Sequence, residues 1–215
     1  MTKIPISSLL MKTLVKALLI SLMAAMPVPV IAQSDDVLEM SIDDNIATPE
    51  VPRKAKQYVA AAMDQLRRHM IKNKYTVESL RDGEVIEITI PCAELFAPGE
   101  VELKANAAEL LRPFGLVVRE PQKYKVLVAV HTDDTGDDMY SDSISAARAN
   151  AVDDCLWQIA GERDTNVIPY GIGKDEPRVS NATRPGRAQN RRVEIFIIPD
   201  YGLLEMAGVK RKKND

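Results

Sequence analysis

The chain has 215 residues, of which 46% are hydrophobic and 27% are charged, and its formal net charge is −3. This composition is typical of a globular protein and excludes a disordered chain, and the length allows one ordinary domain beside a processed leader. The negative charge argues against a nucleic-acid partner, because binding to phosphates requires a basic surface.

The first 32 residues have the pattern of an export signal. Lysines precede an apolar run at residues 17–26, and Val30-Ile31-Ala32 follows as the cleavage pattern. We predict a signal peptide at residues 1–32 that is cleaved after Ala32, which places the mature protein in the periplasm. The alternative is an uncleaved membrane anchor, which the short run disfavours because a spanning helix needs about 20 apolar residues.

Two further segments precede the main pattern of strands. Residues 33–50 are acidic and short of large apolar side chains, which predicts a linker. Apolar residues then recur at helical spacing through residues 53–73, which predicts a helix with one buried stripe. The helix either packs on its own domain or joins two copies into a homo-oligomer. The stripe consists of Ala55, Tyr58, Val59, Ala62, Met63, Leu66 and Met70.

A β-hairpin follows this helix. Residues 75–90 alternate around Asp82-Gly83, a dipeptide that tolerates positive φ, and this is a strong hairpin signal. The alternation puts Ile86, Ile88 and Ile90 on one inward face. Residues 51–84 are therefore expected to form an N-terminal helix and strand extension.

The remaining pattern alternates helices with strands. It predicts a helix at 105–111 ended or kinked by Pro113, a strand at 124–130, a helix at 143–159, and strands at 167–170 and 192–198. No helix is expected between the last two strands. The order β-hairpin, α, β, α, β, β predicts an α/β fold, an α+β sandwich with a mixed sheet.

The two cysteines of the sequence, Cys92 and Cys155, follow a strand and lie on the apolar face of a helix. An oxidising compartment would permit a disulfide between them. We favour the alternative of two buried free thiols.

Opposite charges are predicted to meet where the third strand ends. Asp133 follows that strand, and Arg148 is expected in the opening turns of the next helix. In open α/β sheets, ligands bind at this edge. Asp133 can accept hydrogen bonds from an ammonium, while Arg148 and the helix N-terminus bind a carboxylate, which predicts a zwitterionic amino-acid end as ligand. The alternative is a structural salt bridge between Asp133 and Arg148.

Several motifs occur together in chain order. They are Leu95-Phe96 with Gly99, His131-Thr132-Asp133 with Gly136, Ser145 with Arg148-Ala149, and Asn181-Ala182-Thr183-Arg184-Pro185-Gly186-Arg187-Ala188-Gln189-Asn190-Arg191-Arg192-Val193. In this combination the sequence resembles the OmpA-like C-terminal domain family, which includes OmpA, the peptidoglycan-associated lipoprotein and the flagellar stator protein MotB. The resemblance covers roughly residues 85–198.

The resemblance implies a βαβαββ domain, at residues 85–199, that binds the diaminopimelate side chain of peptidoglycan stem peptides. It assigns the ligand-binding Asp to Asp133 and the ligand-binding Arg to Arg148, with Thr135 and Arg191 as further contacts. At Ser141 the family usually has Asn, so a hydroxyl replaces an amide at this position of the ligand site.

The other residues of the motifs are expected to support the site. We expect Thr132 and Asn190 to do so, and Arg187 and Arg192 to brace loops. The acidic residues around Asp134 lack the alternating order of a calcium loop, so no metal site is expected.

The resemblance implies peptidoglycan as the partner and a location at the cell wall or outer membrane. No enzymatic activity and no cofactor are expected, because the sequence has no Gly-x-Ser-x-Gly turn, no zinc-ligand set and no paired carboxylates with a clear role. The alternative is an envelope module with a degenerate ligand site that binds outer-membrane or other envelope proteins, and Ser141 motivates it. Residues 200–215 are expected to form a solvated basic tail.

Overall fold

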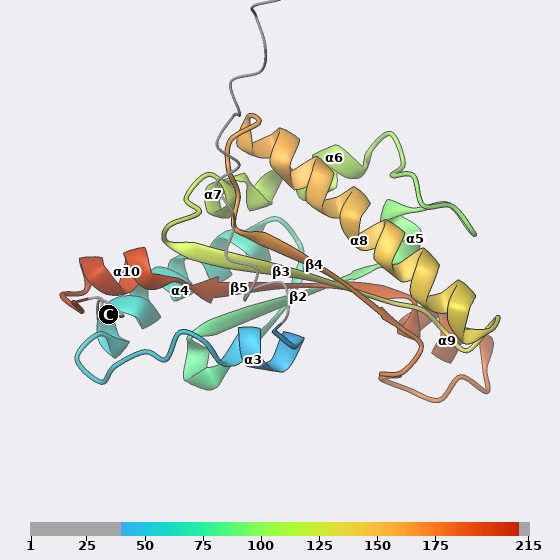
Figure 1. Ribbon diagram of the computed structural model, residues 1–215, viewed down its shortest axis with the longest axis horizontal. Helices are drawn as coiled ribbons and strands as arrows, with labels where there is room; N and C mark the ends of the chain where they lie inside the picture. The colour runs from blue at the N-terminus through green and yellow to red at the C-terminus, as the bar shows by residue number, and fades with distance from the viewer. Residues whose placement is uncertain (1–39, 211–215) are drawn as a thin grey trace, which may run out of the picture. The chain divides into compact units, whose positions relative to one another are not determined.

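A computed structural model describes residues 40–210 (Figure 1). The predicted signal peptide, the first part of the predicted linker and the last five residues lie outside the described residues. Within residues 40–210, no helix combines the length and the apolar character needed to cross a membrane.

The fold is built on one five-stranded sheet with the order β1-β2-β5-β3-β4. The strands are β1 (Thr76–Leu80), β2 (Val85–Pro91), β3 (Tyr124–His131), β4 (Val167–Gly173) and β5 (Arg192–Pro199). Strands β3 and β4 are parallel and the other neighbours are antiparallel, so the predicted mixed sheet is confirmed. The last strand, β5, lies in the middle, and all eight of its residues are buried.

Helices lie on both faces of this sheet (Figure 1). They are α3 (Ile42–Ala47), α4 (Lys56–Lys72), α5 (Cys92–Leu95), α6 (Ala107–Leu111), α7 (Gly115–Val118), α8 (Asp138–Ala160), α9 (Arg184–Asn190) and α10 (Tyr201–Met206). Helices α5 to α8 lie over one face, and α3 lies on the other. Pro113 falls in a 3-10 turn between α6 and α7, because proline lacks the N–H that would continue α6. Its predicted helix-ending role is confirmed.

The apolar stripe of α4 packs into the domain's own core. Val59, Met63 and Met70 are at most 1% exposed and join the same apolar cluster as Ile88 of β2. Burying side chains of this size contributes about 1.5–3 kcal/mol each. Packing of this stripe on its own domain is therefore confirmed, whereas Tyr58 of the stripe is 42% exposed and self-association stays an untested prediction.

The hairpin of β1 and β2 has the predicted inward face, since Ile86, Ile88 and Ile90 are at most 2% exposed. Its turn is longer than a two-residue turn. Residues 81–83 form a 3-10 turn in which all three have positive φ, including 57° at Asp82 and 88° at Gly83. Glycine accepts this backbone region without strain.

The region between β4 and β5 contains helix α9, so the expectation of no helix there is wrong. The Thr183 hydroxyl caps this helix by accepting a hydrogen bond from the Gly186 N–H at 3.1 Å, and a proline lies in its first turn. A helix of seven residues is too short to produce a clear hydrophobic period.

The prediction of a linker is wrong for its second half, because this part of the chain contains α3 and is fixed to the sheet. Asn45 is 1% exposed; its side chain accepts from the Lys125 ammonium at 2.9 Å and contacts the Tyr170 hydroxyl at 2.7 Å. The composition predicted a linker because few large apolar residues are present. The segment is held by polar contacts instead.

The start of the predicted basic tail forms α10, and Leu203 and Leu204 are buried in the core. Apolar burial rather than charge decides the structure of this part of the tail. Elsewhere in the core, Cys92 and Cys155 are both buried free thiols, as the favoured alternative predicts.

Candidate functional site

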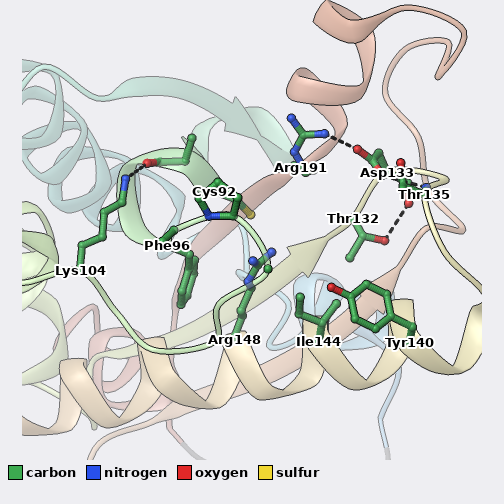
Figure 2. Close-up of a pocket in the computed structure, with 14 residues that line it drawn as sticks. Cys92, Phe96, Lys104, Thr132, Asp133, Thr135, Tyr140, Ile144, Arg148 and Arg191 are labelled. Atoms are coloured by element: carbon green, nitrogen blue, oxygen red, sulfur yellow. Dashed lines mark hydrogen bonds and ion pairs between the residues drawn. The ribbon is translucent and has the colours of Figure 1, made fainter.

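A cavity of about 480 Å³ opens where β3 ends and β5 begins (Figure 2). Its walls come from α5 and the following loop, from the loop after β3, and from α8. The lining residues are Cys92, Ala93, Phe96, Ala97, Pro98, Gly99, Lys104, Thr132, Asp133, Thr135, Tyr140, Ile144, Arg148 and Arg191.

Asp133 supplies the negative charge of this cavity. It lies two residues after β3 and is 5% exposed. Its Oδ1 accepts from the Thr135 N–H at 2.8 Å, and its Oδ2 forms an ion pair with Arg191. Burial alone would raise the pKa of the Asp133 carboxyl, but the hydrogen bonds from Thr135 and the charge of Arg191 outweigh it and lower the pKa. Asp133 is therefore ionised at neutral pH.

Arg148 supplies a positive charge from α8. It is 5% exposed, its Nε donates to the Glu100 carbonyl at 2.8 Å, and its guanidinium lies 5.0 Å from the centre of the Phe96 ring. Within residues 40–210 it forms no ion pair. The alternative of a salt bridge between Asp133 and Arg148 is not what the structure contains, because Asp133 pairs with Arg191.

The start of α8 requires a correction. The helix begins at Asp138, five residues earlier than predicted, so Arg148 lies in the third turn rather than the opening turns. At 1.5 Å per residue, Arg148 is about 15 Å along the axis from the helix start. The amides of the helix N-terminus therefore cannot bind the same carboxylate as Arg148.

Five of the seven residues predicted for the site line the cavity: Thr132, Asp133, Thr135, Arg148 and Arg191. The other two are absent from its lining. Ser141 is fully buried in the first turns of α8, and its hydroxyl has no hydrogen-bond partner among residues 40–210.

Asn190, also predicted to support the site, is fully buried and braces a loop. Its side-chain amide donates to the Val179 carbonyl at 2.8 Å and contacts the Asn181 side chain at 2.7 Å. The Arg187 guanidinium donates to the Asn181 carbonyl at 2.7 Å, which confirms its bracing role.

Nine of the lining residues were missed as site residues, among them Cys92, Phe96, Lys104 and Tyr140. Phe96 belongs to the Leu95-Phe96 motif of the family resemblance, and this motif could have identified it as a site residue. Lys104 lies in an irregular segment whose path the sequence does not predict. Burial raises the pKa of the Cys92 thiol to about 11, so this side chain is neutral at physiological pH.

A second group of charged residues lies beside the cavity, and we call it the paired cluster: Glu87, His131, Arg178, Arg192 and Glu194. Arg192 is 4% exposed and donates from Nε to Glu194 at 2.5 Å. It also donates to the carbonyl of Glu176 in the loop after β4 at 3.1 Å, which confirms its bracing role. His131 Nε2 lies 3.2 Å from Glu194, and Arg178 pairs with both glutamates. Burial would raise the pKa of Glu194, but its contacts with His131 and Arg192 lower it to about 2.

No group of three or more His, Cys, Asp or Glu side chains within residues 40–210 is arranged to hold a metal ion. The acidic residues beside Asp133 are solvent-exposed, and one of them, Asp138, pairs with Lys174 at 2.6 Å.

Comparison with known sequences places this site in a family. The model of the OmpA family matches residues 95–191. Escherichia coli YfiB is 33% identical over 106 residues, which cover 49% of this chain and 66% of YfiB. The peptidoglycan-binding protein ArfA of Mycobacterium tuberculosis is 40% identical over 122 residues, which cover 50% of this chain and 36% of ArfA. The chain therefore spans under two-thirds of the length of these relatives.

Solved structures share the fold. A MotB-like protein from Desulfovibrio vulgaris matches with a TM-score of 0.57 at 24% identity, covering 68% of this chain and 99% of that chain. The cell wall anchor of the T6SS from Pseudomonas aeruginosa matches with a TM-score of 0.53 at 28% identity, covering 70% and 100%. Residues 95–191 of the chain are an OmpA family domain.

Proposed function

We propose that the protein binds peptidoglycan without covalent bonds, through the free end of diaminopimelate in the stem peptide, and so tethers or organises the cell envelope. Similarity supports this proposal, because ArfA is named a peptidoglycan-binding protein and the T6SS protein a cell wall anchor. The periplasmic location rests on the signal peptide predicted at residues 1–32.

The observation that carries the proposal is that Asp133 and Arg148 line one cavity without pairing with each other. A carboxylate has about four acceptor sites, so Asp133 can accept from a ligand ammonium beside its contacts with Thr135 and Arg191. The terminal nitrogens of Arg148 can donate in parallel to a ligand carboxylate. One carbon that carries both groups, as at the free end of diaminopimelate, satisfies both residues.

The size and lining of the cavity fit such a ligand. Small-molecule sites typically measure about 300–1,000 Å³, and this cavity measures about 480 Å³. Phe96, Tyr140 and Ile144 add apolar surface to the lining, against which the methylene chain of diaminopimelate can pack.

Binding alone is proposed, without a chemical step. The one thiol of the cavity, Cys92, has a raised pKa of about 11 and is protonated at neutral pH, whereas a nucleophilic cysteine must be a thiolate. The degenerate-site alternative stays an untested prediction, because the buried Ser141 hydroxyl does not line the cavity and so does not replace the amide contact that the family usually has there.

Sedimentation with purified cell walls tests the proposal. Lysine-type walls are the matched control, because the lysine side chain ends in an ammonium without the carboxylate assigned to Arg148. The protein is expected to co-sediment with diaminopimelate-type walls and to remain largely in the supernatant with lysine-type walls. Equal sedimentation with both would contradict recognition of the zwitterion.

A further inference from the structure

The charges that line the cavity do not balance. Lys104, Arg148 and Arg191 are cations, Asp133 is the one ionised carboxylate among the lining residues, and Cys92 is neutral. Two positive charges are left over. A zwitterion has no net charge, so the ligand end assigned to Asp133 and Arg148 leaves this excess in place.

Lys104 is the lining cation that the proposed function does not use. Its ammonium donates to the Ala93 carbonyl, and no ion pair with it occurs within residues 40–210. An ammonium has three donors, so two remain. A neutral carbonyl does not compensate the charge.

The position of Lys104 is fixed by its backbone. Its N–H donates to the Leu95 carbonyl at 2.9 Å, and a β-bridge joins Phe96 to Leu103. These two contacts close the base of the loop that carries Glu100, whose carbonyl accepts from Arg148. Lys104 is therefore part of the same local structure that holds Arg148.

Lys104 lies at the opposite side of the cavity from Asp133. In Figure 2, Phe96 and Arg148 lie between Lys104 and Asp133. A ligand with its ammonium at Asp133 and its first carboxylate at Arg148 can thus extend past the Phe96 ring towards Lys104.

We propose that Lys104 forms a second carboxylate subsite, so that the ligand carries a further carboxylate beyond the zwitterionic end. This inference rests on the proposed function and narrows its substrate class. The carboxyl at the acylated end of diaminopimelate meets the requirement when diaminopimelate is the last residue of the stem peptide. A carboxyl of a neighbouring stem residue has the same chemistry.

Two small ligands isolate this subsite. N-acetyl-meso-diaminopimelate has one zwitterionic end and one acylated end with a free carboxylate, and its carboxamide at the acylated end lacks only that charge. Calorimetric titration of the protein should show the acid binding about 2- to 5-fold more tightly than the amide, the range expected for a partly exposed ion pair.

Variants at Lys104 test whether this side chain causes the preference for the acid over the amide. Lys104→Met should bind acid and amide equally, with the affinity for the amide unchanged, and Lys104→Arg should restore the preference. Lys72→Met, at an exposed position at the end of α4, is the control and should behave as wild type. Thermal melts establish that each variant is folded.

The outcomes separate the two proposals. Wild-type protein that binds acid and amide equally well, together with an affinity for an amidated stem tripeptide that is unchanged in Lys104→Met, would overturn the second subsite and leave the proposed function intact. Loss of affinity for both ligands in Lys104→Met would also overturn it, because Lys104 would then act on the loop rather than on a carboxylate. If neither ligand binds wild type, the proposed function fails and the subsite with it.

A stem tripeptide amidated at diaminopimelate identifies the source of the carboxylate. If its affinity still depends on Lys104, the carboxylate comes from a neighbouring residue of the stem. If the dependence disappears, the carboxylate is that of diaminopimelate.

Discussion

The cavity and the paired cluster contain charged side chains that lie a few residues apart in sequence. These charges are paired with one another in the cluster, whereas two cations of the cavity are not. Arg192 contacts Glu194, whereas its neighbour Arg191 lines the cavity beside Asp133. Each arginine of the paired cluster has a carboxylate within the cluster. Arg148 and Lys104 in the cavity have no such partner among residues 40–210. Removing one partner of a buried ion pair destabilises a fold, whereas unpaired cations in a cavity are available to a ligand.

The largest effect is expected on stability, from Arg192→Ala. The change leaves buried Glu194 without its closest cation but still beside Arg178 and His131, and breaking a buried ion pair costs at most about 3–5 kcal/mol. Urea unfolding should show a loss of this size. Arg148→Ala leaves no carboxylate without a partner, so this variant should lose much less free energy of unfolding. Equal losses in the two variants would erase the distinction between the cluster and the cavity.

Acid should weaken the paired cluster. The pKa of Glu194 is about 2 in the fold and 4.5 ordinarily, so its contribution to stability is present above pH 4.5 and is lost as the pH falls towards 2. The shift corresponds to roughly 3 kcal/mol at 1.36 kcal/mol per pKa unit. Urea unfolding between pH 5 and pH 2 should show this fall, and Glu194→Gln should flatten it. An unchanged slope in the variant would refute the assignment.

Substitution of a cavity residue should change the affinity for cell walls rather than the stability of the fold. Losing a charge-assisted hydrogen bond costs about 1.5–3 kcal/mol, so Arg148→Ala should weaken binding to diaminopimelate-type walls roughly 10- to 150-fold. Arg68→Ala is the matched control, because the Arg68 side chain is 66% exposed on α4 and lines no part of the cavity. Wild-type affinity in Arg148→Ala would remove Arg148 from the site.

The smallest effect is expected from Ser141→Ala. The Ser141 hydroxyl is buried outside the cavity, so wall binding should change by less than about 2-fold, well below the cost of a lost hydrogen bond to a ligand. The same sedimentation assay measures it. A large loss would return Ser141 to the ligand site.

Sequence patterns predicted the elements with strong periods and missed those held by polar contacts. The alternating isoleucines of β2 and the stripe of α4 have one face to bury, so their place in the fold follows from hydrophobicity. Helix α3 is held by Asn45 and Lys125, which lie 80 positions apart in the chain. Only the tertiary structure brings these two residues together.

The same limit applies within the site. The placement of Asp133 after a strand and Arg148 on the next helix predicted that both would line one site. The pairing of Arg191 with Asp133 depends on the neighbouring positions of β3 and β5 in the sheet, and the return of the chain that brings Lys104 to the cavity depends on the bridge between Phe96 and Leu103. No local pattern encodes that pairing.

A crystal structure of the protein with bound meso-diaminopimelate tests the central claim most directly. We expect one end of the ligand in the cavity, with its ammonium about 3 Å from an Asp133 carboxylate oxygen and its carboxylate at the same range from the terminal nitrogens of Arg148. A ligand bound elsewhere, or Asp133 and Arg148 joined to each other across a closed cavity, would contradict the account.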